Sequence, residues 1–78
     1  MAQIRLESLL SEILGRALES EVIVGLRGEN RLRGKLRAYD MHMNLVLDDA
    51  ASLDGNEVNK RYGLLFIRGD GVVFVVLA

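Results

Sequence analysis

The sequence predicts a small, mostly β protein, in which one N-terminal helix packs on five short antiparallel strands that form a strongly bent, open barrel. Three observations favour this fold class. Apolar residues recur first with a helical period and later with a period of two, and short turns rich in glycine and asparagine separate the later segments. With 78 residues, the chain is long enough for one domain, which we assign to residues 1–78.

An amphipathic helix is predicted over residues 4–18. Apolar side chains recur there every three or four positions and form one stripe: Leu6, Leu9, Leu10, Ile13, Leu14, Ala17 and Leu18. Gly15 lies within the stripe. Because the apolar spacing continues past it, we expect the helix to continue too, at a cost of ~1 kcal/mol relative to alanine. We expect the stripe to pack on the domain's own sheet; binding to a membrane or a partner helix is the alternative.

Five strands are predicted after the helix, at residues 22–26, 31–38, 45–47, 64–67 and 72–77. In the second of these, cationic residues alternate with apolar or small ones, so one face is buried and the other is in water. Gly34 lies on the buried face. A glycine there indicates a sharp bend of the sheet or the close approach of another backbone.

The last predicted strand, residues 72–77, contains no polar residue. An apolar strand on a free sheet edge promotes aggregation. We therefore expect both faces of this strand to be covered and its edge to pair with a strand of another subunit. Repetition of such a heterologous contact closes into a ring. Burial of the strand within its own barrel is the alternative.

Composition restricts the class of protein. The formal net charge is −1, so any nucleic-acid binding has to come from a local site and not from a generally basic surface. The absence of cysteine excludes disulfides and thiolate metal sites. No apolar run approaches the ~20 residues of a membrane span, and the first residues lack the pattern of a signal peptide. We expect a cytoplasmic protein with no membrane partner, metal or cofactor.

Two segments resemble the two sequence motifs of the Sm and Sm-like (LSm) RNA-binding proteins. Residues 22–50, VIVGLRGENRLRGKLRAYDMHMNLVLDDA, are similar to the first motif, and residues 63–76, which begin GLLFIRGDGVVFV, are similar to the second. Arg68 and Gly69 stand where the bacterial Hfq branch has a Lys-His pair, so the resemblance is to the archaeal-type branch. It implies a helix on a five-stranded, SH3-like open barrel. It also implies a ring of seven subunits, or alternatively six, joined through the fourth and fifth strands.

The resemblance places the base-binding residues of this family at His42, Asn44, Arg68 and Asp70. Their chemistry suits single-stranded RNA, whose bases are splayed out, stacked and read along their edges. His42 and Arg68 offer two flat groups between which a base can stack. The amide of Asn44 has a donor beside an acceptor, the complement of the imide N–H and keto oxygen of uracil. Asp70 would hold Arg68 in the stacking pose by a charge-assisted hydrogen bond.

Other residues near the pocket have support roles or open alternatives. Asp40 is expected to fix its loop through the backbone, and Met43 and Gly69 are expected to support the pocket. Tyr39 is either a second stacking platform or a partly buried barrel residue. Residues 27–37 contain five cationic side chains and one glutamate, which gives a charge of +4. This strand face either contacts phosphates or is a solvated surface.

The sequence departs from the family pattern at its helix. Many relatives begin the helix with Pro-Leu, whereas this chain has Leu10-Ser11 there and nine residues before it, so a longer helix is expected. Glu19 stands where a glycine before a lysine is usual, which argues against an RNA contact at that position.

Three functions from different classes follow. The leading hypothesis is an RNA-binding homo-oligomeric ring that captures single-stranded, U-rich RNA with one uracil per subunit, in RNA processing or ribonucleoprotein assembly. A ring scaffold for protein partners, without base-specific RNA binding, is second. An enzyme is third and is not expected, because the single histidine has no adjacent serine or cysteine nucleophile.

Overall fold

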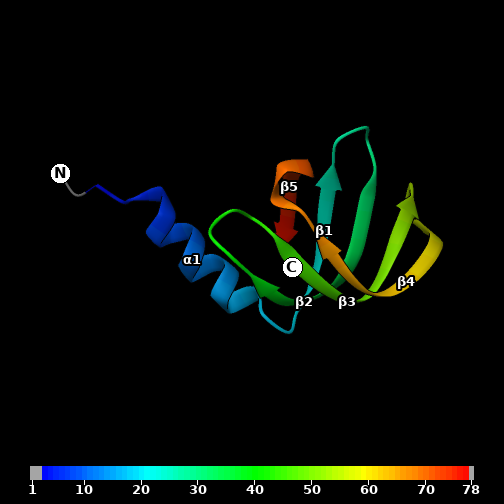
Figure 1. Cartoon of the computed structure of the whole chain (residues 1–78), viewed down its shortest axis with the longest axis horizontal. Helices are drawn as coiled ribbons and strands as arrows, with labels where there is room; N and C mark the ends of the chain where they lie inside the picture. The colour runs from blue at the N-terminus through cyan, green and yellow to red at the C-terminus, as the bar shows by residue number, and fades with distance from the viewer. Residues whose placement is uncertain (1–2, 78) are drawn as a thin grey trace.

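The computed structural model describes residues 3–77 (Figure 1). In chain order its elements are α1 (Leu6–Ala17), β1 (Glu21–Leu26), β2 (Arg31–Tyr39), β3 (Leu45–Asp54), β4 (Glu57–Ile67), the short 3-10 helix η1 (Gly69–Gly71) and β5 (Val72–Leu77). The strands form one antiparallel sheet in the order β4-β3-β2-β1-β5. The predicted fold class is confirmed, and β4 and β5 are the two open edges of the sheet.

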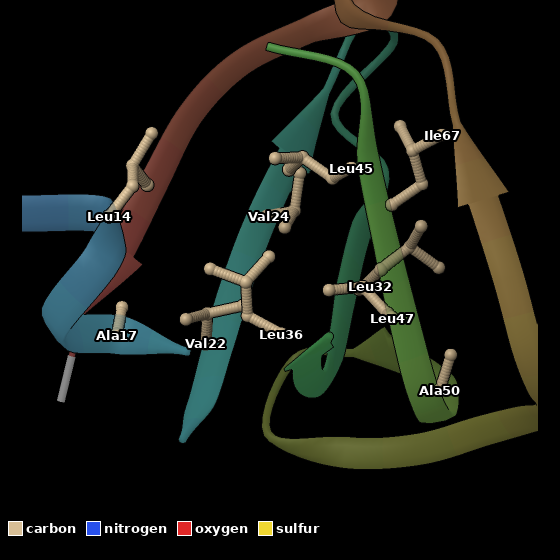
Figure 2. Packing of buried hydrophobic residues seen from close by; sticks show 10 residues of the cluster. All are labelled: Leu14, Ala17, Val22, Val24, Leu32, Leu36, Leu45, Leu47, Ala50 and Ile67. Atoms are coloured by element: carbon tan, nitrogen blue, oxygen red, sulfur yellow. The ribbon is translucent and has the colours of Figure 1, made fainter. Parts of the chain in front are cut away.

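The hydrophobic core lies inside the curve of the sheet and is closed at one end by the last turns of α1 (Figure 2). Its most deeply buried side chains come from alternate positions of β1, β2 and β3, as a half-buried sheet requires: Val22, Val24, Leu36, Leu45 and Leu47. Leu14 and Ala17 add the helix to this cluster, and Ile67 adds the end of β4. The core therefore holds together the ends of the strands from which the candidate site is built.

The sheet bends at glycine, as the sequence predicts for Gly34. The β2–β3 register shifts between Arg33 and Lys35. A Cβ atom on Gly34 would lie 3.1 Å from the carbonyl oxygen of Asp48 and 3.1 Å from the Cβ of Leu47. These contacts are tight, so a side chain at this position would push the two strands apart where their register shifts.

The third and fourth strands are longer than the sequence predicts. β3 runs to Asp54 and not to residue 47, and β4 begins at Glu57 and not at residue 64. The additional segments are mostly polar, and their few apolar residues, such as Ala50 and Ala51, do not alternate with polar ones, so their pattern gave no strand signal. Pairing across the Gly55–Asn56 turn supplies the backbone hydrogen bonds that keep them extended. The result is a β3–β4 hairpin that extends past the core.

The helix is slightly shorter than the predicted range and packs on its own sheet over only part of its length. It continues through Gly15, as expected, and ends at Ala17. Leu14 and Ala17 are buried, but the stripe residues of the first turns are exposed: Leu6, Leu9 and Leu10. Figure 1 shows these first turns extending away from the strands. The expectation that the whole stripe covers the sheet is therefore wrong for the N-terminal half. Within residues 3–77, no helix is long and apolar enough to cross a membrane.

Both open edges of the sheet expose large apolar side chains. On β4, Leu64 and Phe66 are 70% and 62% exposed, and on β5, Val73 is 62% exposed. Phe74 lies over Gly25 of β1, where a Cβ would meet its ring. The last strand is thus not buried within its own barrel, and among residues 3–77 the edge that it forms has no neighbouring strand.

Candidate nucleic-acid interface

Two connections of the sheet come together and form a pocket. One is the loop between β2 and β3, residues 40–44, and the other joins β4 to β5 through η1. Between them lies an open cavity of about 360 Å³ lined by His42, Asn44, Arg68, Gly69 and Asp70. All four predicted base-binding residues are therefore neighbours, although about 25 residues of chain separate the two loops.

Asp40 organises the first loop through its carboxylate. One oxygen, Oδ1, accepts hydrogen bonds from the backbone N–H groups of His42 at 2.9 Å and Asn44 at 3.0 Å. The loop also contains Met43 at a φ of +63°, a left-handed conformation that the carboxylate helps to hold. Hydrogen bonds, first of all from the Asn44 side chain, lower the pKa of Asp40 below its ordinary value of 3.8. Asp40 is thus a structural residue of this loop, as the sequence predicts.

Asn44 joins the two loops through its side-chain amide. Its Nδ2 donates to Oδ2 of Asp40 at 2.8 Å, and its Oδ1 accepts from the backbone N–H of Gly69 at 2.7 Å. An ionised carboxylate only accepts and a backbone N–H only donates, so these partners assign which amide atom is oxygen and which is nitrogen. An amide has two donor hydrogens and two acceptor lone pairs. One of each therefore stays available to a ligand.

Gly69 brings the second loop against the first. A Cβ atom at this position would lie 1.8 Å from the carbonyl oxygen of His42, a distance that no side chain allows. The backbone contact also delivers the N–H that binds Asn44. Only glycine permits this approach, which is the physical reason for its predicted support role.

Arg68 and Asp70 lie on the exposed side of the pocket. Their side chains form an ion pair, with Nη2 of Arg68 3.4 Å from Oδ2 of Asp70, and both are largely in solvent. Arg27 also braces this loop, a role that the sequence did not reveal. Its Nε donates to the Asp70 carbonyl oxygen at 3.1 Å, and its backbone N–H donates to the Gly71 carbonyl oxygen at 3.1 Å. No sequence signal links Arg27 to a loop 43 residues further along the chain.

Tyr39 and Met43 lie on the other side of the β2–β3 loop, against the helix. The Tyr39 hydroxyl donates to the carbonyl oxygen of Ser11 at 3.0 Å and ties α1 to the sheet. Met43 is partly buried and packs on the core. This contact gives Tyr39 a structural role, whereas its stacking on a second base stays a prediction.

Much of the positive charge on β2 is neutralised by nearby acids. Arg37 lies 3.2 Å from Glu19 and 3.0 Å from Asp48, and Arg33 lies 3.7 Å from Glu21. Exposed pairs of this kind lower the local positive potential at little energetic gain. The charges on this face are thus arranged as expected for a solvated surface more than for a phosphate track.

Comparison with known proteins identifies the family. Residues 12–77 match the LSM domain family. An Sm-like protein of Methanosarcina barkeri is 52% identical over 64 residues, which cover 82% of this chain and 89% of the relative. The Sm protein of Pyrococcus abyssi, solved in complex with a uridine heptamer, has a TM-score of 0.82 at 40% identity, with 87% of this chain and 96% of that chain covered. A heptameric archaeal Sm protein has a TM-score of 0.79 at 33% identity, with 86% and 97% covered. The chain belongs to the LSM family and is an Sm-like protein of the archaeal type.

Proposed function

We propose that this protein forms a homo-oligomeric ring of seven subunits that captures single-stranded, U-rich RNA, one uracil per subunit, as a binding protein and not as an enzyme. The observation that carries the proposal is the orientation of the Asn44 amide. Asp40 and Gly69 occupy one donor and one acceptor and leave a matched pair free at the wall of the pocket.

The free groups of Asn44 match the edge of uracil. The imide N–H of uracil is a donor to Oδ1, and a neighbouring keto oxygen is an acceptor for Nδ2. Cytosine has no N–H at that ring position, so it would leave the Asn44 oxygen without its hydrogen bond. His42 and Arg68 line the same cavity and supply flat groups for stacking, which is worth ~1–3 kcal/mol per base and hardly discriminates. Stacking gives affinity for any base, and Asn44 gives the preference for uracil.

The two apolar edges of the sheet favour the proposed ring. β4 and β5 end the sheet on opposite sides, and each exposes large apolar side chains. Pairing β4 of one subunit with β5 of the next covers both edges and repeats around a closed ring. The heptameric archaeal Sm protein and the uridine-heptamer complex are assemblies of relatives whose fold matches this chain.

A ring of identical pockets binds long RNA more tightly than short RNA. Once one uracil is bound, its neighbours meet the next pockets at a high effective concentration. Affinity should therefore rise with oligouridine length until the pockets are filled. Such a ring would hold U-rich segments during RNA processing or ribonucleoprotein assembly.

The test is a titration of labelled heptamers of uridine, cytidine and adenosine at one salt concentration, with wild type, Asn44→Ala and Asn56→Ala. Asn56 lies in the exposed turn of the β3–β4 hairpin and serves as the matched control. We expect wild type and Asn56→Ala to prefer uridine by about 10-fold or more, and Asn44→Ala to lose the preference.

Asn44→Ala also removes the hydrogen bonds that link the two loops. A second ligand therefore separates recognition of the uracil edge from the integrity of the loops. A heptamer of 3-methyluridine keeps the ring and phosphates but lacks the imide N–H. The protein is unchanged in this arm, so weak binding of the 3-methyluridine heptamer reports a contact at the imide edge of the base and not a change in the loops. Equal binding of all heptamers by the assembled ring would contradict the proposal and indicate a scaffold for protein partners.

A further inference from the structure

The free half of α1 forms an apolar surface next to the loop that carries the base pocket. Ile4 and Leu6 are 75% and 65% exposed, and Met41, in the β2–β3 loop, is 86% exposed. Between the helix and this loop lies a groove of about 250 Å³ lined mainly by Leu10, Leu14, Tyr39, Met41 and Met43. Its polar lining residues are Glu7, Ser11 and Asp40. The surface therefore consists of a projecting helix start and an apolar groove beside it.

The helix start lacks the contacts that usually stabilise a short helix. An isolated helix of about 12 residues is marginal in water and depends on packing of its apolar face. Arg5 at its N-cap makes no side-chain capping hydrogen bond. Only the C-terminal turns bury their apolar residues on the sheet. The first turns thus expose an apolar face, and they depend on packing of this face against another surface to stay helical.

The charges of this segment argue against an RNA or membrane cover. Residues 3–14 contain one arginine and two glutamates, a formal charge of −1. The arginine, Arg5, lies 3.8 Å from Glu7. Helices that bind anionic membrane surfaces or RNA phosphates are rich in Lys and Arg. The apolar side chains of this face, with little positive charge among them, suit an apolar protein surface.

We propose that the start of α1 in one subunit packs into the groove beside Met41 of the adjacent subunit. The inference rests on the proposed ring. The β2–β3 loop lines both the groove and the base pocket, and in a closed ring every groove and every helix start recurs at the same position in the next subunit. A helix-to-groove contact is heterologous and, like the strand pairing, repeats from each subunit to the next. It adds a second contact between subunits, separate from the paired edges.

Cross-linking tests this contact directly because the chain has no cysteine. A tagged Leu6→Cys variant and an untagged Met41→Cys variant are unfolded together, refolded together and treated with a short bismaleimide cross-linker. Both positions are exposed, so neither substitution disturbs the core. Ser8→Cys, at an exposed position on the opposite side of the helix, replaces Leu6→Cys in the control.

We expect the mixed tagged–untagged dimer from Leu6→Cys with Met41→Cys after co-refolding, in at least about fivefold excess over the Ser8→Cys control. In a second arm, rings of each variant are assembled separately and then mixed, and native mass spectrometry confirms that subunits have not exchanged. Mixed product in this arm would show that the helix joins two rings, which overturns the proposal. Absence of product in both arms overturns it as well.

The uncross-linked protein distinguishes this result from failure of the ring. If native mass spectrometry finds only single chains, the proposed function fails together with the contact. If it finds rings and no mixed product forms, only the helix contact is wrong.

Discussion

The two loops of the proposed base pocket and the two edges of the sheet differ in how far one chain completes them. The pocket is held by hydrogen bonds within the chain, with Asp40, Asn44 and Gly69 fixed to one another at 2.7–3.0 Å. The edges are strands that expose apolar side chains, and no strand lies beyond them in the part of the chain that the structure describes. The groups proposed to recognise the base are therefore preorganised in the single chain, whereas burial of the apolar edges is left for assembly. Changes at the edges should remove the ring, and changes in the loops should remove base binding without affecting the ring.

The largest effect is expected from Phe66→Glu on β4. The side chain is 62% exposed, so the single chain should still fold, but the charge would be buried in the paired edge. Light scattering should find single chains in place of rings. Affinity for heptauridine should fall by about 100-fold or more, because the pockets are no longer linked.

Asn56→Glu is the control for this change, since it adds the same charge in the exposed β3–β4 turn. It should leave the ring intact. A Phe66→Glu protein that still forms rings would show that β4 is not an assembly edge.

Gly69→Ala should have the next largest effect, which falls on base binding and not on the ring. Its Cβ would meet the His42 carbonyl oxygen, so the loops separate and Asn44 loses the Gly69 N–H. We expect heptauridine affinity to fall by about 100-fold, on the order of 3 kcal/mol, measured by fluorescence anisotropy.

Rings of Gly69→Ala should persist in light scattering, because the edges are unchanged. Gly71→Ala is the matched control: a Cβ there meets nothing within 4 Å, and binding should be close to wild type. Loss of the ring in Gly69→Ala would mean that pocket and edges are not independent.

A smaller, pH-dependent effect is expected at Asp40. The pKa of Asp40 is lowered in the folded protein. The carboxylate therefore stabilises the loop fully at pH values above its ordinary pKa of 3.8, and this contribution is lost as the pH falls through the pKa of the folded protein. Asp40→Asn should bind heptauridine more weakly than wild type by a constant factor from about pH 7 to about pH 5, and the difference should shrink below about pH 4.

Measuring this difference cancels titrations that both proteins share. A difference that vanishes between about pH 7 and about pH 5 would contradict a role for the Asp40 carboxylate with a lowered pKa.

The sequence predicts elements well where burial repeats regularly and poorly where pairing alone holds the chain. The helix stripe and the alternation in β2 revealed α1 and β2, and Gly34 revealed the bend. The polar segment 57–63 carries no such period, so the first half of β4 was missed. The apolar stripe also did not show that the first turns of α1 lie beyond the sheet. Periodicity identifies the apolar face of a helix but not the surface that covers it.

For the candidate site, the sequence predicted which residues lie together but not how they are joined. His42, Asn44, Arg68 and Asp70 were found through the resemblance, and the structure places them around one cavity. The bond from Gly69 to Asn44 and the brace from Arg27 join segments far apart in the chain. Such contacts depend on the register of folded strands, which a single sequence does not encode in any local pattern.

The smallest effect is expected from Asp70→Asn, which tests whether the exposed side of the pocket is preorganised like its inner wall. Asp70 and Arg68 are 3.4 Å apart and mostly in solvent, and exposed ion pairs are worth ~0–1 kcal/mol. Heptauridine affinity should therefore fall by less than about fivefold. Arg68→Lys keeps the charge but removes the flat guanidinium, so it should cost more than Asp70→Asn, because stacking needs the plane and not the ion pair. If Asp70→Asn instead costs as much as Gly69→Ala, Asp70 contacts the RNA itself, and the outer side of the pocket reads the ligand as directly as Asn44 does.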